Sequence, residues 1–169
     1  MYILAIDPGR TTGVCILQTN DSKCGFEVVT ALEMPWESRF ELLKTLIDGT
    51  FLDQEKPQPP EAVVVESFAL RSNRAIEQTG SDFPSSQIIG IVEAFLWMET
   101  FKAEPRKSFD FPRESGLQGF NRLHFQQPSV FSRVAIEPEH VVWVEGSEHK
   151  KDAYRHARYY YIMNVRAKE

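Results

Sequence analysis

The chain has 169 residues, of which 42% are hydrophobic, 12% aromatic and 25% charged, a composition that predicts a globular protein and excludes disordered and fibrous classes. We expect one domain over residues 1–169, because a chain of this length buries enough surface to fold without disulfides or a metal. The net charge of −5 argues mildly against a nucleic-acid partner.

The basic residues are concentrated in the second half of the chain. Residues 1–99 hold 7 Lys and Arg against 15 Asp and Glu, a balance of −8, whereas residues 100–169 hold 12 against 9, a balance of +3. A chain with this asymmetry can carry a local positive face despite its acidic total.

Membrane and secreted proteins do not fit the sequence pattern. No apolar run reaches about 18 residues, and the first residues resemble a strand with no basic leader, so neither a membrane span nor a secretory signal is expected. Cys15 and Cys24 lack CxxC spacing. Their pattern favours a reducing compartment, and we therefore expect a cytoplasmic protein.

The first half of the chain predicts a meander of strands followed by alternating helices and strands. Apolar, partly β-branched runs punctuated by turn residues predict strands over 2–7, 12–17 and 25–32. Helical spacing of apolar residues predicts a helix over 37–48, and the run AVVVE over 62–66 is typical of a strand buried on both faces. A long apolar helix is expected over 83–101.

The second half of the chain is less regular. Residues 103–119 are rich in proline, glycine and charge and predict a long loop, which is expected to be functional or mobile. A strand is predicted over 120–126, a short helix over 128–133, a short strand over 141–144 and a closing helix over 148–165. The order of elements predicts an α/β domain with a mixed sheet.

An acidic residue ends each of two predicted strands. Asp7 ends the first strand, and the small residues that follow in Asp7-Pro8-Gly9 and Thr11-Thr12-Gly13 leave room for a metal ion or a phosphate. Asp-Pro-Gly is also simply a good turn. Glu66 places a charge after four apolar residues, where a purely structural strand would rarely have one, and this favours a site residue. The alternative is that Glu66 is simply an exposed strand end. If the two strands are neighbours, both carboxylates project from one edge of the sheet.

The start of the last helix adds two further candidates. His149 and Asp152 are three residues apart and share one helix face. An aspartate there is also explained by the helix dipole alone. Three acids and a histidine at the ends of separate elements fit two-metal phosphoryl chemistry, in which two ions about 4 Å apart activate water and stabilise the leaving oxygen. His156, four residues after Asp152, is the substitute if His149 is not functional.

Three segments resemble RuvC-type Holliday-junction resolvases of the ribonuclease-H-like superfamily. The first strand of these resolvases is similar to ILAIDPGRTTGVCIL, their glutamate-bearing fourth strand to AVVVESF, and their final helix to EHKKDAYRHARYY. The ending resembles the branch that uses histidine plus aspartate, and acidic, compact members of this kind resemble those of bacteriophages. A phage protein would act in the cytoplasm of a bacterial host.

The resemblance implies a fold, a site and a reaction. It implies a ribonuclease-H-like α/β fold whose mixed five-stranded sheet begins with a three-strand meander and is flanked by helices. It also implies an endonuclease that resolves four-way junctions or other branched DNA with two Mg²⁺ ions, which Mn²⁺ can replace. The implied catalytic and metal-binding residues are Asp7, Glu66, His149 and Asp152.

The predicted DNA contacts lie around the proposed site and in the polar loops. Basic side chains there can clamp phosphates, although each is also explained as ordinary solvated surface. In the family an aromatic wedge follows the strand-four glutamate by three residues, but position 69 is alanine here and the nearest aromatic is Phe68. The predicted DNA-binding residues are Phe68, Arg71, Arg74, Arg106, Lys107, Lys150, Lys151 and Arg155.

Three other functions share parts of this pattern. Actin-like sugar kinases begin with a similar strand and turn but need two such domains, and no second copy of the motif is present. An inactive DNA-binding relative predicts a missing acid, whereas all the expected positions are filled. A nuclease of the pre-ribosomal-RNA-processing type shares the opening motif and remains the alternative; it usually lacks the long apolar helix.

That long helix predicts a homodimer. From Gln87 to Phe101 apolar residues occupy nearly the whole helix circumference, and only Gln87, Glu93, Glu99 and Thr100 interrupt it. A helix that covers one sheet face needs a single apolar stripe, so the second face is expected to bind another copy of the chain. The alternative is that the 103–119 loop covers it.

Overall fold

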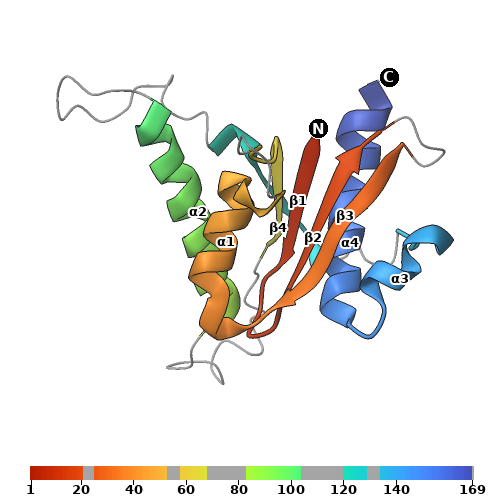
Figure 1. Ribbon diagram of the computed structural model, residues 1–169, viewed down its shortest axis with the longest axis horizontal. Helices are drawn as coiled ribbons and strands as arrows, with labels where there is room; N and C mark the ends of the chain where they lie inside the picture. Colours follow the sequence, from red (N-terminus) through yellow and green to blue (C-terminus); the bar gives the residue numbers. More distant parts are fainter. Residues whose placement is uncertain (21–24, 53–57, 68–82, 104–119, 129–133, 169) are drawn as a thin grey trace.

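A computed structural model describes residues 1–20, 25–52, 58–67, 83–103, 120–128 and 134–168. Within these residues a twisted sheet is covered by helices on both faces (Figure 1). None of the helices in these ranges is long and apolar enough to span a membrane.

The described strands form one mixed sheet of five strands in the order β3-β2-β1-β4-β5. The first three pair antiparallel as a meander, whereas β1 with β4 and β4 with β5 are parallel. This confirms the mixed five-stranded sheet that begins with a meander. The strands are β1 Tyr2–Asp7, β2 Thr12–Thr19, β3 Phe26–Met34, β4 Ala62–Glu66 and β5 Leu123–Gln126.

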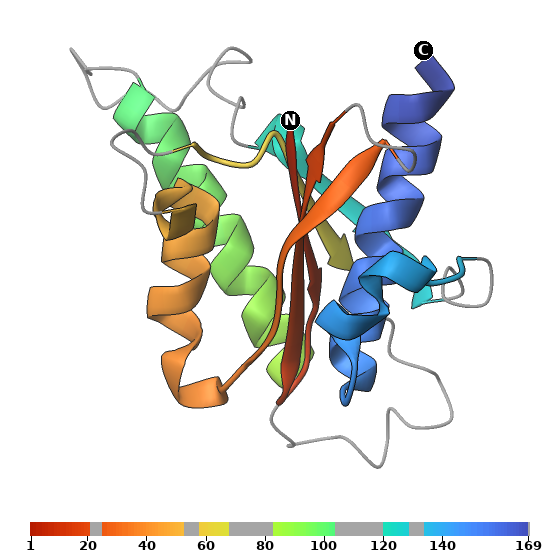
Figure 2. The same cartoon turned by 45° about the vertical axis from the view of Figure 1, so that its right-hand side comes forward.

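Alternate side chains of the central strands enter two separate cores. Leu4 and Ile6 face helices α1 (Arg39–Asp48) and α2 (Pro84–Ala103), while Ile3 and Ala5 face helix α4 (Glu148–Tyr160). Figure 2 shows α1 and α2 on one side of the sheet and α4 on the other. Because both faces are covered, the central strands are continuous apolar runs rather than alternating ones.

The register places the ends of β1 and β4 side by side. Ile6 pairs with Val65 in the parallel ladder, so Asp7 and Glu66 follow at the same edge of the sheet. On the other side of β1, Asp7 lies opposite Gly13 of β2. The two carboxylates predicted to share an edge therefore do so.

The prediction of a strand over 141–144 is wrong. These residues form the short helix α3, Val141–Val144, in which only Val144 is buried. The β-branched composition favoured a strand, but a 3-10 turn at Pro138–His140 leads directly into helical backbone, with φ −55° and ψ −41° at Val141. Helical geometry therefore continues from the turn.

The other predicted elements that fall within the described residues agree with the structure except at their boundaries. A 3-10 turn, Trp36–Ser38, precedes α1, and another, Phe120–Arg122, occupies the start of the predicted fifth strand. The closing helix changes to a π-helical turn at Tyr161–Val165 and then a 3-10 turn at Arg166–Lys168. Most of the predicted loop over 103–119 and of the predicted helix over 128–133 lies outside the described residues.

Candidate active site

The turn after β1 is held rigidly behind Asp7. The Thr12 hydroxyl donates to the Gly9 carbonyl at 2.8 Å, and the Gly9 N–H donates back to the hydroxyl at 3.3 Å. From the first turn of α2, the Ser85 hydroxyl donates to the Pro8 carbonyl at 2.7 Å. Small residues in this motif thus fix the strand end, and Asp7 itself is buried, with 9% of its surface exposed.

Helix α4 begins directly over β2. Its N-cap is Ser147, whose side chain accepts a hydrogen bond from the Lys150 N–H at 3.1 Å and contacts Glu33 of β3. The helix backbone approaches β2 so closely that a Cβ on Gly13 would lie 2.0 Å from the carbonyl oxygen of His149. The first turn of α4 is therefore placed beside the end of β1.

This placement brings His149 to Asp7. Nδ1 of His149 lies 2.8 Å from Oδ2 of Asp7, a contact between residues 142 positions apart. The His149 side chain is 45% exposed and that of Asp7 12% exposed, so the imidazole reaches the buried carboxylate from a position open to solvent. Two of the four predicted catalytic residues are thus in direct contact.

The pKa of Asp7 is raised to about 6, chiefly because burial disfavours its charged form. The negative charges of Glu66 and Asp152 raise this pKa further, while the hydrogen bond from His149 opposes the rise. The three predicted acids are therefore close enough to influence one another electrostatically. A cation among them would relieve the repulsion.

Glu66, the last residue of β4, is paired with a second histidine. Nε2 of His156 donates to Oε2 of Glu66 at 3.2 Å, and Nδ1 of His156 lies 2.8 Å from the side-chain oxygen of Gln126 in β5. His156 is completely buried. From the sequence, His156 is expected at the site only if His149 is not functional. In the structure, each of the two histidines contacts a different carboxylate.

Asp152 lies one turn beyond His149 on α4 and contacts Arg155. The Arg155 guanidinium donates to its carboxylate at 2.7 Å. Burial raises the pKa of Asp152, and the ion pair with Arg155 works against that rise. Arg155, predicted as a DNA contact, thus holds one of the predicted metal-binding acids.

The donor chemistry of the site suits a hard divalent cation. Asp7, Glu66 and Asp152 offer carboxylate oxygens, the ligands that Mg²⁺ prefers. As the side chains stand, however, no group of three or more His, Cys, Asp or Glu within the described ranges is arranged to hold a metal ion. Each carboxylate instead contacts a nitrogen of His149, His156 or Arg155. Metal binding would replace the contacts of Asp7 with His149 and of Asp152 with Arg155 by metal–oxygen bonds.

Only part of the predicted DNA-binding surface can be placed. Lys150 and Lys151 lie in the first turn of α4, where the Lys151 ammonium donates to Glu148 at 2.6 Å. Both lysines are partly exposed and adjacent to His149. The predicted contacts outside the described residues are Phe68, Arg71, Arg74, Arg106 and Lys107.

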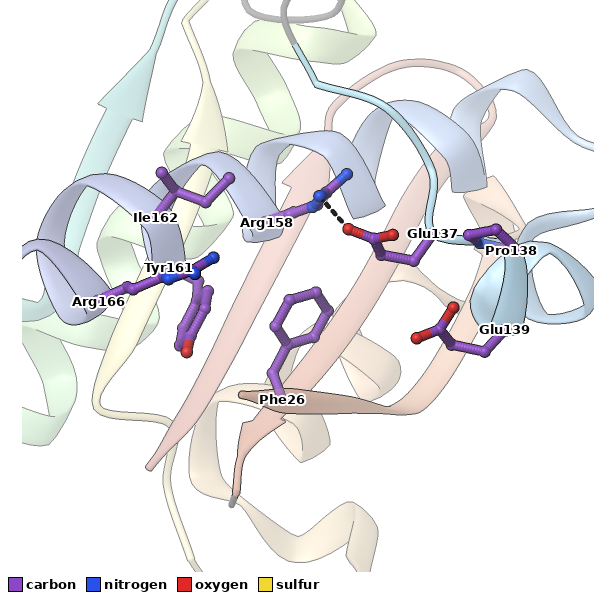
Figure 3. A pocket seen from close by; sticks show the side chains of 8 residues that line it. All are labelled: Phe26, Glu137, Pro138, Glu139, Arg158, Tyr161, Ile162 and Arg166. Carbon is purple, nitrogen blue, oxygen red and sulfur yellow. Dashed lines mark hydrogen bonds and ion pairs between the residues drawn. The ribbon is translucent and has the colours of Figure 1, made fainter. Parts of the chain in front are cut away.

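A cavity of about 370 Å³ lies beside the end of α4 and the turns that follow it (Figure 3). Arg158 and Glu137, which form an ion pair, both line this cavity, and Phe26 and Tyr161 contribute aromatic side chains to its lining. None of the four predicted catalytic residues lines it. The cavity is therefore separate from the carboxylate site.

The sheet order and the helices on both faces give this chain the fold of RuvC, a ribonuclease-H-like fold. RuvC of Thermus thermophilus in complex with a Holliday junction substrate is 16% identical over 94% of this chain and 91% of that one, with a TM-score of 0.51. A second Thermus thermophilus RuvC structure is 17% identical over 96% and 95% of the two chains, with a TM-score of 0.50.

A weaker likeness is to the fowlpox virus resolvase bound to Holliday junction DNA, 11% identical over 95% of this chain and 96% of that one, with a TM-score of 0.48. Neither a scan against protein families nor a search of curated proteins finds a significant match to the sequence.

Proposed function

We propose that this protein is a divalent-metal-dependent endonuclease that cuts branched DNA, above all four-way junctions, and leaves 5′-phosphate and 3′-hydroxyl ends. The observation that carries the proposal is the convergence of Asp7, Glu66 and Asp152 with His149 at one sheet edge, where burial and mutual repulsion raise the pKa of Asp7. The solved structures of similar fold include RuvC of Thermus thermophilus in complex with a Holliday junction substrate. Residues 1–169 would act as one nuclease domain.

The carboxylates of Asp7, Glu66 and Asp152 would hold two Mg²⁺ ions, or Mn²⁺ in their place. Bound divalent ions supply a Lewis acid and a nucleophile by lowering the pKa of bound water. His149, half-exposed and in contact with Asp7, would ligate a metal or orient the attacking water. The burial of Asp7 and of the Thr12 hydroxyl behind it keeps this strand end rigid.

DNA binding would be local and salt-sensitive despite the net charge of −5. Bound metal ions would neutralise part of the carboxylate cluster, and basic residues of the second half of the chain would contact phosphates. Lys150 and Lys151 are partly exposed next to the site. We assign the remaining phosphate contacts to Arg71, Arg74, Arg106, Lys107 and Arg155, and an apolar contact with the bases to Phe68.

A homodimer would supply two such sites. One side of α2 is buried on the sheet through Ile88, Val92 and Leu96, while Trp97 is 45% and Met98 43% exposed. Large apolar side chains on the outer side of a helix are typical of a protein interface. Resolution of a junction requires two symmetric cuts, which a two-fold pair of active sites provides.

A substrate panel separates this function from its alternatives. The purified protein is incubated in Mg²⁺ or in EDTA with a four-way junction, a Y-fork, a flap, a mismatched duplex, linear duplex DNA and structured RNA. Preferential Mg²⁺-dependent cutting of the junction supports the proposal. Cutting of RNA alone favours an RNA-processing nuclease, and tight junction binding without cutting favours an inactive DNA-binding relative.

A further inference from the structure

His156 occupies a position in α4 that a small apolar residue would fill at lower cost. Its side chain is 0% exposed, and its helical neighbours facing the sheet, Ala153 and Ala157, are equally buried. Burial of an imidazole in such a core is unfavourable unless its nitrogens are hydrogen-bonded. The contacts of this ring therefore need an explanation beyond packing.

The ring joins three elements at the edge of the sheet. It projects from α4, contacts Glu66 at the end of β4 through Nε2 at 3.2 Å, and contacts Gln126 at the end of β5 through Nδ1 at 2.8 Å. β4 and β5 are paired in register at this point, with Glu66 opposite Gln126. The Ser67 N–H also donates to the Gln126 carbonyl at 2.7 Å, which closes the strand end behind the carboxylate.

We propose that His156 is a positioning residue: with Gln126 as its support, it holds the Glu66 carboxylate in the orientation in which Glu66 binds the metal ion. The inference rests on the proposed function and assigns a role within the same site. Glu66 has the flexibility of a long side chain, and an ordered hydrogen-bond donor reduces the number of conformations that compete with metal binding.

The two histidines of α4 thus have different tasks. Both ring nitrogens of His156 already contact Glu66 and Gln126, and the ring has no access to solvent. His149 is half-exposed and reaches Asp7 directly. His149 is therefore the histidine placed to meet metal, water or substrate, and His156 acts only through Glu66.

The test is Mn²⁺ binding to the DNA-free protein by titration calorimetry, compared with junction cleavage over a range of Mn²⁺ concentrations. His156→Leu removes both hydrogen bonds of the ring but keeps a side chain of similar size, and His156→Gln keeps a hydrogen-bond donor. Gln126→Leu removes the contact that supports His156, at a position that is partly exposed. The matched control is His140→Leu, because His140 is also a buried histidine but bonds Tyr154 at 3.0 Å, away from the site. Circular dichroism verifies that each variant is folded.

His156→Leu should weaken Mn²⁺ binding roughly 10–100-fold, the usual effect of losing a hydrogen-bonding partner of a metal ligand. His156→Gln should recover part of this affinity, Gln126→Leu should lose less, and His140→Leu should leave it unchanged. Cleavage by His156→Leu should approach the wild-type rate at saturating Mn²⁺. If His156→Leu bound Mn²⁺ with wild-type affinity, the inference would be overturned and the nuclease assignment would stay intact.

If His156→Leu does not fold, Gln126→Leu decides: a wild-type Mn²⁺ affinity in that variant overturns the inference. A wild-type protein that neither binds Mn²⁺ nor cuts the junction contradicts the proposed function, and the role of His156 with it.

Discussion

Gly13 and His149 approach so closely that any side chain at position 13 would collide with the helix: a Cβ there would lie 2.0 Å from the His149 carbonyl oxygen and 2.3 Å from its carbonyl carbon. Gly13 is also the residue opposite Asp7 in the β1–β2 ladder. The absence of a side chain at one position of β2 thus allows α4 to place His149 on the carboxylate of the neighbouring strand.

Gly13→Ala is expected to displace the first turn of α4 and to destabilise the fold by about 1–3 kcal/mol, the range typical of overpacking a tight contact. Urea unfolding measures this cost. The control is Gly90→Ala in α2, where a Cβ would meet nothing within 4 Å. That change should stabilise the protein slightly, because alanine favours a helix over glycine. Equal stability of the two variants would contradict the close approach.

The raised pKa of Asp7 predicts a pH-dependent effect of Asp7→Asn on stability. Below about pH 4 the carboxyl is protonated in the folded and unfolded chains alike, and its burial costs nothing electrostatically. As the pH rises through the folded pKa of about 6, the folded state must carry the charge and loses stability. Without metal, Asp7→Asn should therefore stabilise the protein by up to about 3 kcal/mol at pH 8.

Urea unfolding in EDTA at pH 5 and pH 8 measures this effect, which should be smaller at pH 5. Asp48→Asn serves as the control, since Asp48 forms an exposed ion pair with Lys44 at 2.9 Å and such pairs contribute little. Destabilisation by Asp7→Asn at pH 8 would show that burial does not disfavour the Asp7 charge.

Trp97→Glu is expected to convert a dimer into a folded monomer. The Trp97 side chain lies on the outer side of α2 and is 45% exposed, so the substitution removes little of the core but places a charge in the proposed interface. Sedimentation equilibrium at micromolar concentration measures the mass. Met163→Glu, which alters an exposed side chain in the turn after α4, should leave the mass unchanged. A monomeric wild-type protein would refute the dimer.

Junction affinity is expected to fall steeply as salt rises, because phosphate contacts release counterions. Binding is measured with the Asp7→Asn protein, so that cleavage does not interfere. Lys150→Ala should weaken binding and lower the salt dependence by about one counterion. Lys44→Ala, on α1 and paired with Asp48, should not. An affinity that is flat from low to moderate salt would exclude this mode of binding.

Much of the fold could be predicted because the central strands are unusually clear. A strand buried on both faces is a continuous apolar run, and a carboxylate directly after such a run identifies the strand end. Asp7 and Glu66 were found in this way, and the parallel pairing of β1 with β4 makes them neighbours. His149 and Asp152 are three residues apart, and residues at this spacing lie on the same face of a helix. Their shared helix face could therefore also be predicted.

What could not be predicted depends on contacts between distant segments. The contact of His156 with Glu66 joins residues 90 positions apart, and the sequence offers only the four-residue spacing from Asp152 as a signal. The pair of Arg155 with Asp152 is a local one that the i, i+3 spacing signals, but the expectation that Arg155 contacts phosphate did not take this signal into account. The strand predicted over 141–144 failed because β-branched composition outweighed the influence of the preceding turn, which starts a helix.

Cleavage of a synthetic four-way junction by the wild-type protein and by Asp7→Asn, in Mg²⁺ and with a linear duplex of the same sequence as control, tests the central claim most directly. The wild-type protein should cut the junction symmetrically and the duplex little. Asp7→Asn should bind the junction but cut it at least roughly 100-fold more slowly, since the charge at the most buried of the three site carboxylates is lost. An Asp7→Asn protein as active as the wild type would contradict the assignment of this carboxylate cluster as the active site.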